Sequence, residues 1–317
     1  MDINIINVVL CGGGVVGGGV CEIINNKNSE LLKHGIVFNI TKILVKSLNK
    51  PRDFMIPTNA IITNNFQDIM EDQKVDMIVE VIGGETIAKD IMHFALSKGK
   101  PFITANKALL AKHLDEIINI NTNNTFIGFE SAVGGGIPII KSLQRDIIHI
   151  DDVNQISGIL NGTTNFILSK MAINGWSYDC ALSNAQNLGY AEADPTADVE
   201  GYDAMYKICI LCKLGLGHIM NIDNIPRFGI TRINSVDFEY AKILNCVIKL
   251  IGTCKLEDNK IQCIVSPMLV NTSNTIASIN NATNIVEVKS KYLTNTYYVG
   301  QGAGRYPTAC ARNENHT

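Results

Sequence analysis

The feature that most constrains this chain is a glycine loop that directly follows an apolar strand at the start of the sequence. Residues 3–11 are almost continuously apolar and β-branched, which predicts a central strand of a parallel sheet. The next residues read GGGVVG from Gly12 to Gly17, and residues 15–26 are predicted to form a helix. A strand, a glycine loop and a helix in this order form the first half of a βαβ unit.

Each position of this loop has a separate physical task. Gly12 permits a tight turn, Gly14 lets the backbone approach a pyrophosphate, and Gly17 lets the helix pack closely on the strand. The helix start at Val15 and Val16 offers N–H groups to phosphates. The loop therefore predicts a dinucleotide site, and a purely structural turn is the alternative.

The rest of the chain divides by its secondary-structure pattern. Up to about residue 130, predicted strands (38–46, 76–82, 101–104, 125–129) alternate with predicted helices (86–98, 109–119). This alternation predicts an α/β fold with a doubly wound Rossmann-type sheet over residues 1–130, to which the segment 300–317 is a candidate to return. Residues 131–299 are predicted to form an α+β domain with helices at 139–150, 165–172, 205–214 and 235–250 and strands at 155–160, 260–269, 284–289 and 296–299.

The end of the second strand bears on the choice of cofactor. Sites for NAD usually place an acid there, where it binds the ribose 2′-hydroxyl. This chain has Lys46 there and Arg52 shortly after. Cations suit a 2′-phosphate, so NADP is favoured over NAD. The alternative is that Lys46 is only solvated and both cofactors are accepted.

Composition excludes several classes of protein. The net charge is −3, charged residues make up 18%, and no basic run occurs, so we expect neither nucleic-acid nor membrane-surface binding. No apolar run reaches transmembrane length, and the N-terminus lacks the positive region of a signal peptide. The nine scattered cysteines fit a reducing cytosol, and Cys209 and Cys212 are interpreted as core packing rather than a metal or redox pair.

A second group of candidate residues follows predicted strands or lies in glycine-rich turns. Gly83 ends one strand, and Thr104 and Lys107 follow another, at the edge of the sheet where ligands bind. The loop after Glu130 has backbone carbonyls, at Val133, Gly135 and Ile137, that could hold a hard cation. The alternatives are that Lys107 is an ordinary surface lysine and that the loop after Glu130 is a hinge between domains. The segment 300–309 carries Gly304 and is either a loop that returns to the cofactor or a flexible tail.

The stretch from residue 185 to residue 207 concentrates acids near one lysine. Asp203 and Lys207 are four residues apart and share a helix face. Carboxylates can bind a substrate ammonium, and a partly desolvated lysine can donate a proton during hydride transfer. A solvated acidic surface is the alternative. Glu192 and Asp198 complete the set of candidate acids.

Taken together, these motifs resemble homoserine dehydrogenase. The matching strings cover nearly the whole chain in the family's order: GGGVVG at Gly12, TANKALLA at Thr104, FESAVGGGIPII at Phe129, GILNGTTNFIL at Gly158, GYAEADPTADVEGYDAMYK at Gly189 and GQGAGRYPTA at Gly300. The resemblance implies interconversion of L-aspartate 4-semialdehyde and L-homoserine with NAD(P)H, toward threonine, methionine and isoleucine.

The resemblance also implies roles for the candidate residues. Lys207 and Lys107 match the family's two functional lysines, and substrate binding falls to Lys207 with Glu192, Asp198 and Asp203. The carbonyls of Glu130, Val133, Gly135 and Ile137 match the family's monovalent-cation site, which implies sodium as the bound ion. The cofactor set is Gly12, Gly14, Val15, Val16, Gly17, Lys46, Arg52, Gly83, Thr104, Lys107 and Gly304.

The resemblance further implies a cytoplasmic homodimer formed through strands of the second domain. The sequence contains neither an ACT regulatory domain nor an aspartate kinase, so we expect no threonine site of the ACT type. Two alternatives remain: another amino-acid or sugar dehydrogenase of the same architecture, and a non-catalytic or decayed nucleotide-binding protein.

Overall fold

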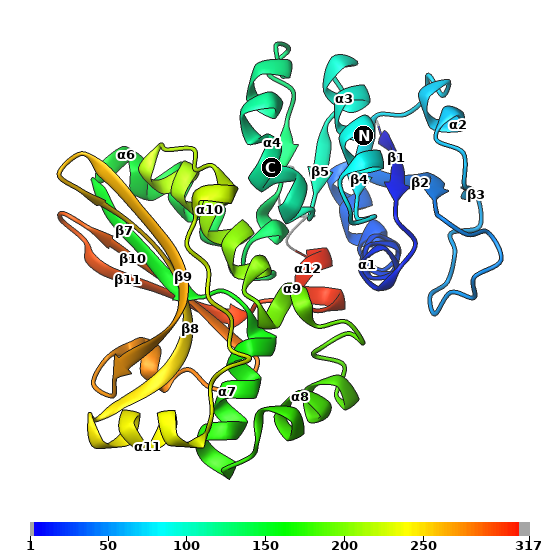
Figure 1. The fold of residues 1–317 in the computed structure, drawn as a ribbon. Coiled ribbons are helices and arrows are strands. Elements are labelled where there is room, and N and C mark those ends of the chain that lie inside the picture. Colours follow the sequence, from blue (N-terminus) through cyan, green and yellow to red (C-terminus); the bar gives the residue numbers. More distant parts are fainter. Residues whose placement is uncertain (1–2, 311–317) are drawn as a thin grey trace. The chain divides into compact units, whose positions relative to one another are not determined.

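The computed structural model describes residues 3–310, which form two compact units (Figure 1). The first unit contains the chain up to Ala132 together with the described residues from Gly304 onward. The second unit runs from Val133 to Ala303. The last residues of the candidate returning segment, 311–317, lie outside the described part of the chain.

The first unit is built on a parallel sheet of six strands in the order β3-β2-β1-β4-β5-β6. Its core consists of apolar side chains from the central strands, such as Val9 and Leu10, which are fully buried. The strands are β1 (Asn4–Cys11), β2 (Ile36–Leu44), β3 (Ile61–Thr63), β4 (Met77–Glu80), β5 (Phe102–Thr104) and β6 (Ile127–Gly128).

Helices connect these strands on both faces of the sheet. The chain runs from β1 through α1 to β2 in one direction along the sheet, and from β4 through α3 to β5 in the other. Because such crossovers are right-handed, α1 and α3 cover opposite faces. The order reverses between β1 and β4, where sheets of this kind bind ligands. The predicted doubly wound fold is confirmed; its helices are α1 (Val15–Leu31), α2 (Gln67–Met70), α3 (Thr86–Ser97), α4 (Lys107–Ile120) and α12 (Arg305–Cys310).

The second unit contains an antiparallel sheet of five strands in the order β11-β10-β7-β8-β9. Two hairpins, β8–β9 and β10–β11, flank the central strand β7. The strands are β7 (Val153–Ile159), β8 (Cys246–Glu257), β9 (Lys260–Asn271), β10 (Thr283–Ser290) and β11 (Thr294–Gln301).

Helix α10 packs on one face of this sheet, and helix α7 contacts strands β8 and β10 (Figure 1). A Cβ atom added at Gly252 on β8 would lie 3.4 Å from the Ile208 side chain of α10, so the helix approaches the strand closely. The helices of this unit are α5 (Ile139–Lys141), α6 (Ile148–Ile150), α7 (Gly162–Asn174), α8 (Tyr178–Asn187), α9 (Thr196–Val199), α10 (Tyr202–Leu216) and α11 (Ser235–Ile243), with a π-helical segment at Ser142–Ile147.

The helix predicted over residues 235–250 is wrong in its second half. Helix α11 ends at Ile243, and β8 begins at Cys246. The intervening Asn245 has a positive φ of 53°, which stops a right-handed helix. An apolar run of this length fits either a helix or a strand. It forms a strand because it pairs with β9 through a turn at Asp258 and Asn259, both of which have positive φ.

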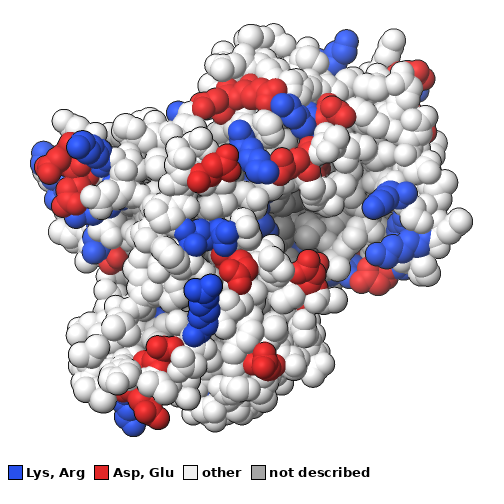
Figure 2. Space-filling model, viewed as in Figure 1, with Lys and Arg blue, Asp and Glu red and all other residues white. Residues whose placement is uncertain are grey.

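Two general surface properties follow from the described residues. None of the helices in residues 3–310 has the length and apolar character needed to cross a bilayer. On the face drawn in Figure 2, Lys and Arg side chains lie among Asp and Glu side chains rather than in a field of one sign.

Candidate active site

The glycine loop between β1 and α1 has the geometry that dinucleotide binding requires. Gly12 has a φ of 121°, and a Cβ atom there would lie 2.6 Å from the carbonyl oxygen of Val81. A Cβ at Gly17 would overlap the Gly12 carbonyl oxygen, so this glycine lets the helix approach the strand. A Cβ at Gly14 would meet nothing within 4 Å, so packing within the protein does not require a glycine there. An approaching ligand does explain it.

Helix α1 begins at this loop without a side-chain cap. Gly14 is the N-cap residue, and the first helical hydrogen bond runs from the Gly18 N–H to the Gly14 carbonyl, 2.8 Å. The N–H groups of the first turn, at Val15, Val16 and Gly17, therefore have no acceptor within the helix. Together with the positive end of the helix, they fit the phosphates of a dinucleotide.

Arg52 lies beside this loop, whereas Lys46 is exposed to solvent. The Arg52 guanidinium donates to the carbonyls of Ser47 and Lys50 at 2.9 and 2.8 Å. A Cβ at Gly13 would lie 3.1 Å from Arg52 Nε, and this nitrogen is buried with no hydrogen-bond partner among the described residues. Arg52 is thus held next to the glycine loop, and its Nε is available to bind a ligand.

A hydrogen-bond network joins the carboxyl ends of β4 and β5 and leads to Lys107. Glu80 is fully buried; it accepts from the Ile82 N–H at 2.8 Å and from the Thr104 hydroxyl at 2.5 Å. The Thr104 oxygen accepts in turn from the Asn106 N–H at 2.9 Å. Asn106 caps α4, so Lys107 is the first residue of that helix and is half-buried.

The loop after β4 is tied to the same network. The Asn106 amide donates to the Gly84 carbonyl at 2.5 Å, and Gly83 and Gly84 both have positive φ values. Thr104, Lys107 and Gly83 were predicted from the sequence as candidate residues, whereas Glu80 and Asn106 were not. A carboxylate that ends the apolar strand MIVE was the available signal for Glu80.

In the second unit, Lys207 is buried and paired. Its ammonium on α10 donates to Asp203 Oδ2 at 2.7 Å and to the Leu160 carbonyl at the end of β7 at 2.7 Å. Lys207 and Asp203 are 6% and 5% exposed. The alternative of a solvated i,i+4 pair is therefore wrong for these two residues, because the helix turns them toward the sheet.

Asn161 connects this pair to Asp198. Its side-chain amide donates to Asp203 Oδ2 at 2.9 Å and to Asp198 Oδ1 at 2.6 Å, and its Oδ1 accepts from the Thr164 N–H at 2.8 Å. Asn161 is therefore both the N-cap of α7 and the bridge between two candidate acids. Asn161 was not among the residues predicted from the sequence, although the NGTT turn before a helix marked an N-cap position.

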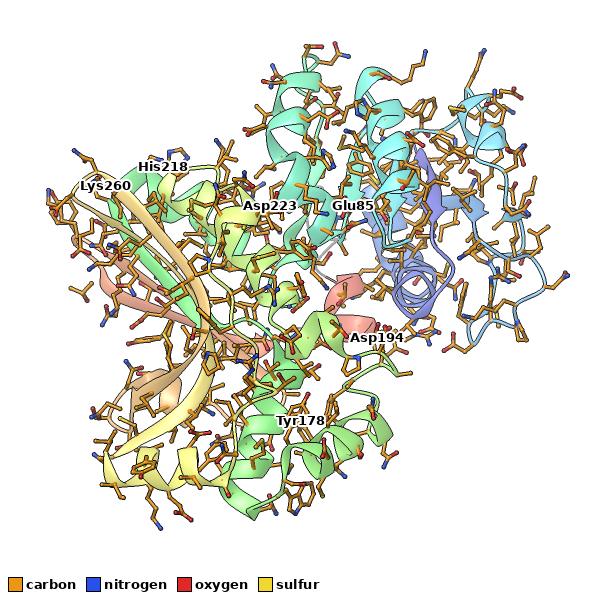
Figure 3. The ribbon with its side chains drawn as sticks, in the orientation of Figure 1. Glu85, Tyr178, Asp194, His218, Asp223 and Lys260 are labelled. Carbon is orange, nitrogen blue, oxygen red and sulfur yellow. The ribbon has the colours of Figure 1, made fainter. Side chains whose placement is uncertain are left out.

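Glu192 lies apart from this network in the described hydrogen bonds. It is exposed in the loop between α8 and α9, and its backbone carbonyl accepts from Gln186 Nε2 at 3.1 Å. Asp194, in the same loop (Figure 3), accepts from the Thr196 N–H and hydroxyl at 3.1 and 2.6 Å and so serves the local turn. The structure brings together Asp198, Asp203 and Lys207 but does not place Glu192 with them.

The residues proposed for a cation belong to both units. Glu130 is 3% exposed at the end of the first unit, and Val133, Gly135 and Ile137 open the second. A tight turn places the Ile137 N–H 2.9 Å from the Gly134 carbonyl, and a Cβ at Gly135 would lie 2.8 Å from the Gly302 carbonyl carbon. The backbone of this loop is thus compact and glycine-dependent, which suits carbonyl ligands.

The cysteine pair on α10 is buried in the core. Cys212 contacts Cys254 on β8, and Cys254 lies opposite Cys263 on β9. Burial raises the pKa of the Cys209 thiol to about 12. The burial of both side chains supports core packing. Among the described residues no group of three or more His, Cys, Asp or Glu side chains is arranged to hold a metal ion.

Gly304 begins the returning segment of the first unit. Its φ of 125° is a conformation that side-chain-bearing residues rarely adopt. Helix α12 follows at once and packs on α1, where glycines at positions 18 and 19 make room for it. The described part of this segment is therefore an ordered helix of the dinucleotide-binding unit rather than a flexible tail.

Comparison with known proteins shows which protein family the chain belongs to. A family model described as "Homoserine dehydrogenase, NAD binding domain" matches residues 12–127, and one described as "Homoserine dehydrogenase" matches residues 138–313. The chain is 38% identical over 306 residues to the homoserine dehydrogenase of Bacillus subtilis, which covers 96% of this chain and 70% of the relative.

The chain belongs to the homoserine dehydrogenase family. Solved structures agree: a homoserine dehydrogenase from Thiobacillus denitrificans superimposes with a TM-score of 0.89 at 36% identity, covering 98% of this chain and 72% of that one. A hyperthermophilic archaeal homoserine dehydrogenase in complex with NADPH has a TM-score of 0.79 at 26% identity, covering 97% and 95% of the two chains.

The predicted family and reaction class are thereby confirmed. The chain is an NAD(P)-dependent oxidoreductase that acts on a CH–OH group, and its first unit contains the family's NAD-binding domain. Its substrate is a small molecule. The alternatives of a different dehydrogenase and of a non-catalytic nucleotide-binding protein are set aside.

Proposed function

We propose that this homoserine dehydrogenase interconverts L-aspartate 4-semialdehyde and L-homoserine with Lys207 as the group that handles the proton. The observation that supports this role is the buried network around Lys207, in which Asp203 and the Leu160 carbonyl fix the ammonium at 2.7 Å each. The nicotinamide, when bound, supplies or accepts the hydride. A fixed ammonium stabilises the alkoxide that forms on the substrate and provides its proton.

The acids of the network bind the amino-acid part of the substrate in this proposal. Asp198, joined to Asp203 through Asn161, offers a carboxylate to the substrate ammonium. Glu192 is the other proposed ligand, from a loop where its carboxylate is exposed. Lys107, at the start of α4, is the second proposed catalytic group.

Replacing Lys207 by alanine tests the central role. We expect kcat to fall by at least about 100-fold, the size of a lost general acid. The change also leaves the buried Asp203 unpaired, which costs about 3–5 kcal/mol of stability, so circular dichroism and thermal melting must accompany the kinetics. Lys213→Ala, on the same helix but at the half-exposed position 213, is the control. Near-normal turnover by a folded Lys207→Ala enzyme would refute the role.

The first unit is proposed to bind NADP in preference to NAD. Arg52 supports this, because its guanidinium lies beside the glycine loop and its buried Nε has no hydrogen-bond partner among residues 3–310. The archaeal relative was solved with NADPH, which is consistent with the proposal. The remaining cofactor contacts are proposed for the glycine loop, Lys46, the loop at Gly83, Thr104 and Lys107, and Gly304. Titrating NADPH and NADH against aspartate semialdehyde gives the ratio of kcat/KM that tests the preference.

A monovalent cation, sodium, is proposed at the carbonyls of Glu130, Val133, Gly135 and Ile137. The glycine-dependent turn at Gly134 and Gly135, with φ values of 75° and 58°, supports this, because such a turn can present consecutive carbonyls. Activity measured with sodium, with potassium and with a large organic cation tests it; equal rates in all three would contradict it.

The second unit is proposed to bind the substrate and to form a homodimer in the cytoplasm. Helix α10 packs on one face of its sheet, and the opposite face carries Thr253, Ile264 and Val299. Val299 is 51% exposed, and Ile264 is half-buried. A second copy of this chain is the proposed partner of this face.

A further inference from the structure

We propose that Arg305, on helix α12, is a positioning residue for cofactor selectivity that neutralises Asp53 and so leaves Arg52 available to the 2′-phosphate of NADP. The inference rests on the NADP preference proposed above. It concerns the first unit alone, to which α1, the loop after β2 and α12 all belong.

Arg305 binds two carboxylates from different parts of this unit. Its Nη1 donates to Asp53 Oδ2 at 2.7 Å, and its Nη2 donates to Glu22 Oε1 at 2.6 Å. The neighbouring Tyr306 hydroxyl donates to the other Glu22 oxygen at 2.8 Å. The guanidinium therefore joins α12 to α1 and to the loop that carries Arg52.

The same region packs on the first turns of α1. A Cβ atom at Gly18 would lie 2.7 Å from the Phe54 ring and 2.8 Å from Arg305 Nη2. Phe54 is buried, so it holds the loop against the helix immediately after Arg52 and Asp53. Arg52 thus lies next to Gly13, and Arg305 lies next to Gly18, further along the same glycine-rich segment.

The charges of this region explain why Asp53 needs a partner. A carboxylate next in sequence to Arg52 would compete for its guanidinium and would repel a dianionic phosphate. The same carboxylate would suit the ribose hydroxyls of NAD, for which such sites normally use an acid. By pairing with Asp53, Arg305 removes the group that would otherwise favour the wrong cofactor.

The test compares direct binding of the two cofactors. The dissociation constants of NADPH and NADH are measured by nucleotide fluorescence at low salt for the wild type, Arg305→Gln, Asp53→Asn and the double variant. In Arg305→Gln we expect NADPH to bind about tenfold more weakly and NADH to bind at least as tightly as it does to the wild type. The double variant, which lacks the released carboxylate, should return to the wild-type ratio.

Two further variants separate charge from packing. Tyr306→Phe removes a hydrogen bond of the same helix to Glu22 without changing charge, and it should leave the NADPH-to-NADH ratio unchanged. Arg305→Lys keeps the charge and should also keep the ratio, which provides the test if Arg305→Gln does not fold. Melting temperatures report any loss of α12 packing in each variant.

The outcomes test the role of Arg305 separately from the NADP preference. A wild type that prefers NADH refutes the NADP preference by itself. The role of Arg305 is refuted if Arg305→Gln weakens both cofactors equally, or if Asp53→Asn fails to restore the ratio in the double variant. A shifted ratio that the second substitution restores supports the role whichever cofactor the wild type prefers.

Discussion

Two lysines of the second unit are both buried but sit in opposite electrostatic surroundings. Lys207 is paired with the carboxylate of Asp203. Lys249, on β8 and 2% exposed, donates to three neutral oxygens: Asn165 Oδ1 at 3.1 Å, the Ile279 carbonyl at 2.5 Å and Asn280 Oδ1 at 3.0 Å. Burial lowers the pKa of Lys249 to about 8. The carboxylate of Asp203 compensates the charge of the first lysine, whereas the second carries a charge that burial disfavours.

Lys249 therefore predicts a dependence of stability on pH. Between about pH 8, its folded pKa, and about pH 10.5, its unfolded pKa, the unfolded chain binds more protons than the folded chain. The free energy of unfolding should rise with pH in this window, by up to about 1.4 kcal/mol per unit from this group. Below the window the penalty is constant.

Urea unfolding of the wild type and of Lys249→Met, from about pH 7 to about pH 10, isolates this contribution. Methionine keeps the apolar stem but does not titrate, so the stability of the wild type relative to the variant should increase across the range. A difference that stays flat with pH would show that burial does not perturb this lysine.

At the scale of elements, the glycines of the loop between β1 and α1 fall into two kinds. Two of them are required by packing within the protein, and one is not. Gly12 and Gly17 are surrounded by atoms of the protein itself, whereas Gly14 faces open space with an ordinary negative φ of −94°. The same residue type thus serves folding at two positions and recognition at the third.

Alanine at Gly14 and at Gly17 should therefore have different effects. Gly14→Ala is expected to melt within a few degrees of the wild type but to bind NADPH at least about tenfold more weakly, because its methyl group occupies the approach to the backbone. Gly17→Ala should lower the melting temperature strongly, since its methyl group overlaps the Gly12 carbonyl. Fluorescence titration and thermal melting read the two effects separately. Equal loss of stability in both variants would contradict this division.

For the whole molecule, the face of the five-stranded sheet opposite α10 is only partly covered among the described residues. The 3-10 helix Thr275–Ser278 packs over one part of it, where Ile159, Ile251 and Ile285 are buried, whereas Thr253 and Ile264 are half-buried. The register places Ile264 opposite Thr253, on the side away from α10, and Thr253 bonds Ser157 at 2.7 Å across β7 and β8. A half-buried apolar and hydroxyl face of this kind suits contact with an identical face.

Light scattering should accordingly find a dimer that a charge on this face disrupts. We expect Ile264→Glu to be monomeric at micromolar concentration, because pairing two copies would bury the new carboxylates. Leu269→Glu, at a 52% exposed position on β9 that points to the other side, is the control. A wild type that is monomeric, or an Ile264→Glu variant that stays dimeric, would exclude this face as the interface.

Much of the fold and site could be read from the sequence because the signals are local. Glycines 12, 14 and 17 are required by backbone geometry within one turn, and the i,i+4 spacing of Asp203 and Lys207 places them on one helix face. These constraints act between residues close in the chain, so composition and spacing reveal them. The order of the motifs was enough to indicate the family that the comparisons confirm.

Only the tertiary structure decided the features that depend on distant partners. The first residues of the strand Cys246–Glu257 were predicted to be helical, and pairing with β9 makes them a strand. Asn161 bridges carboxylates that lie 37 and 42 residues away. Glu80 and Thr104, and Arg305 with Asp53, likewise meet across 24 and 252 residues. A buried polar group must find a hydrogen-bond partner, but the sequence alone does not say which one, because the packing of sheets and helices makes that choice.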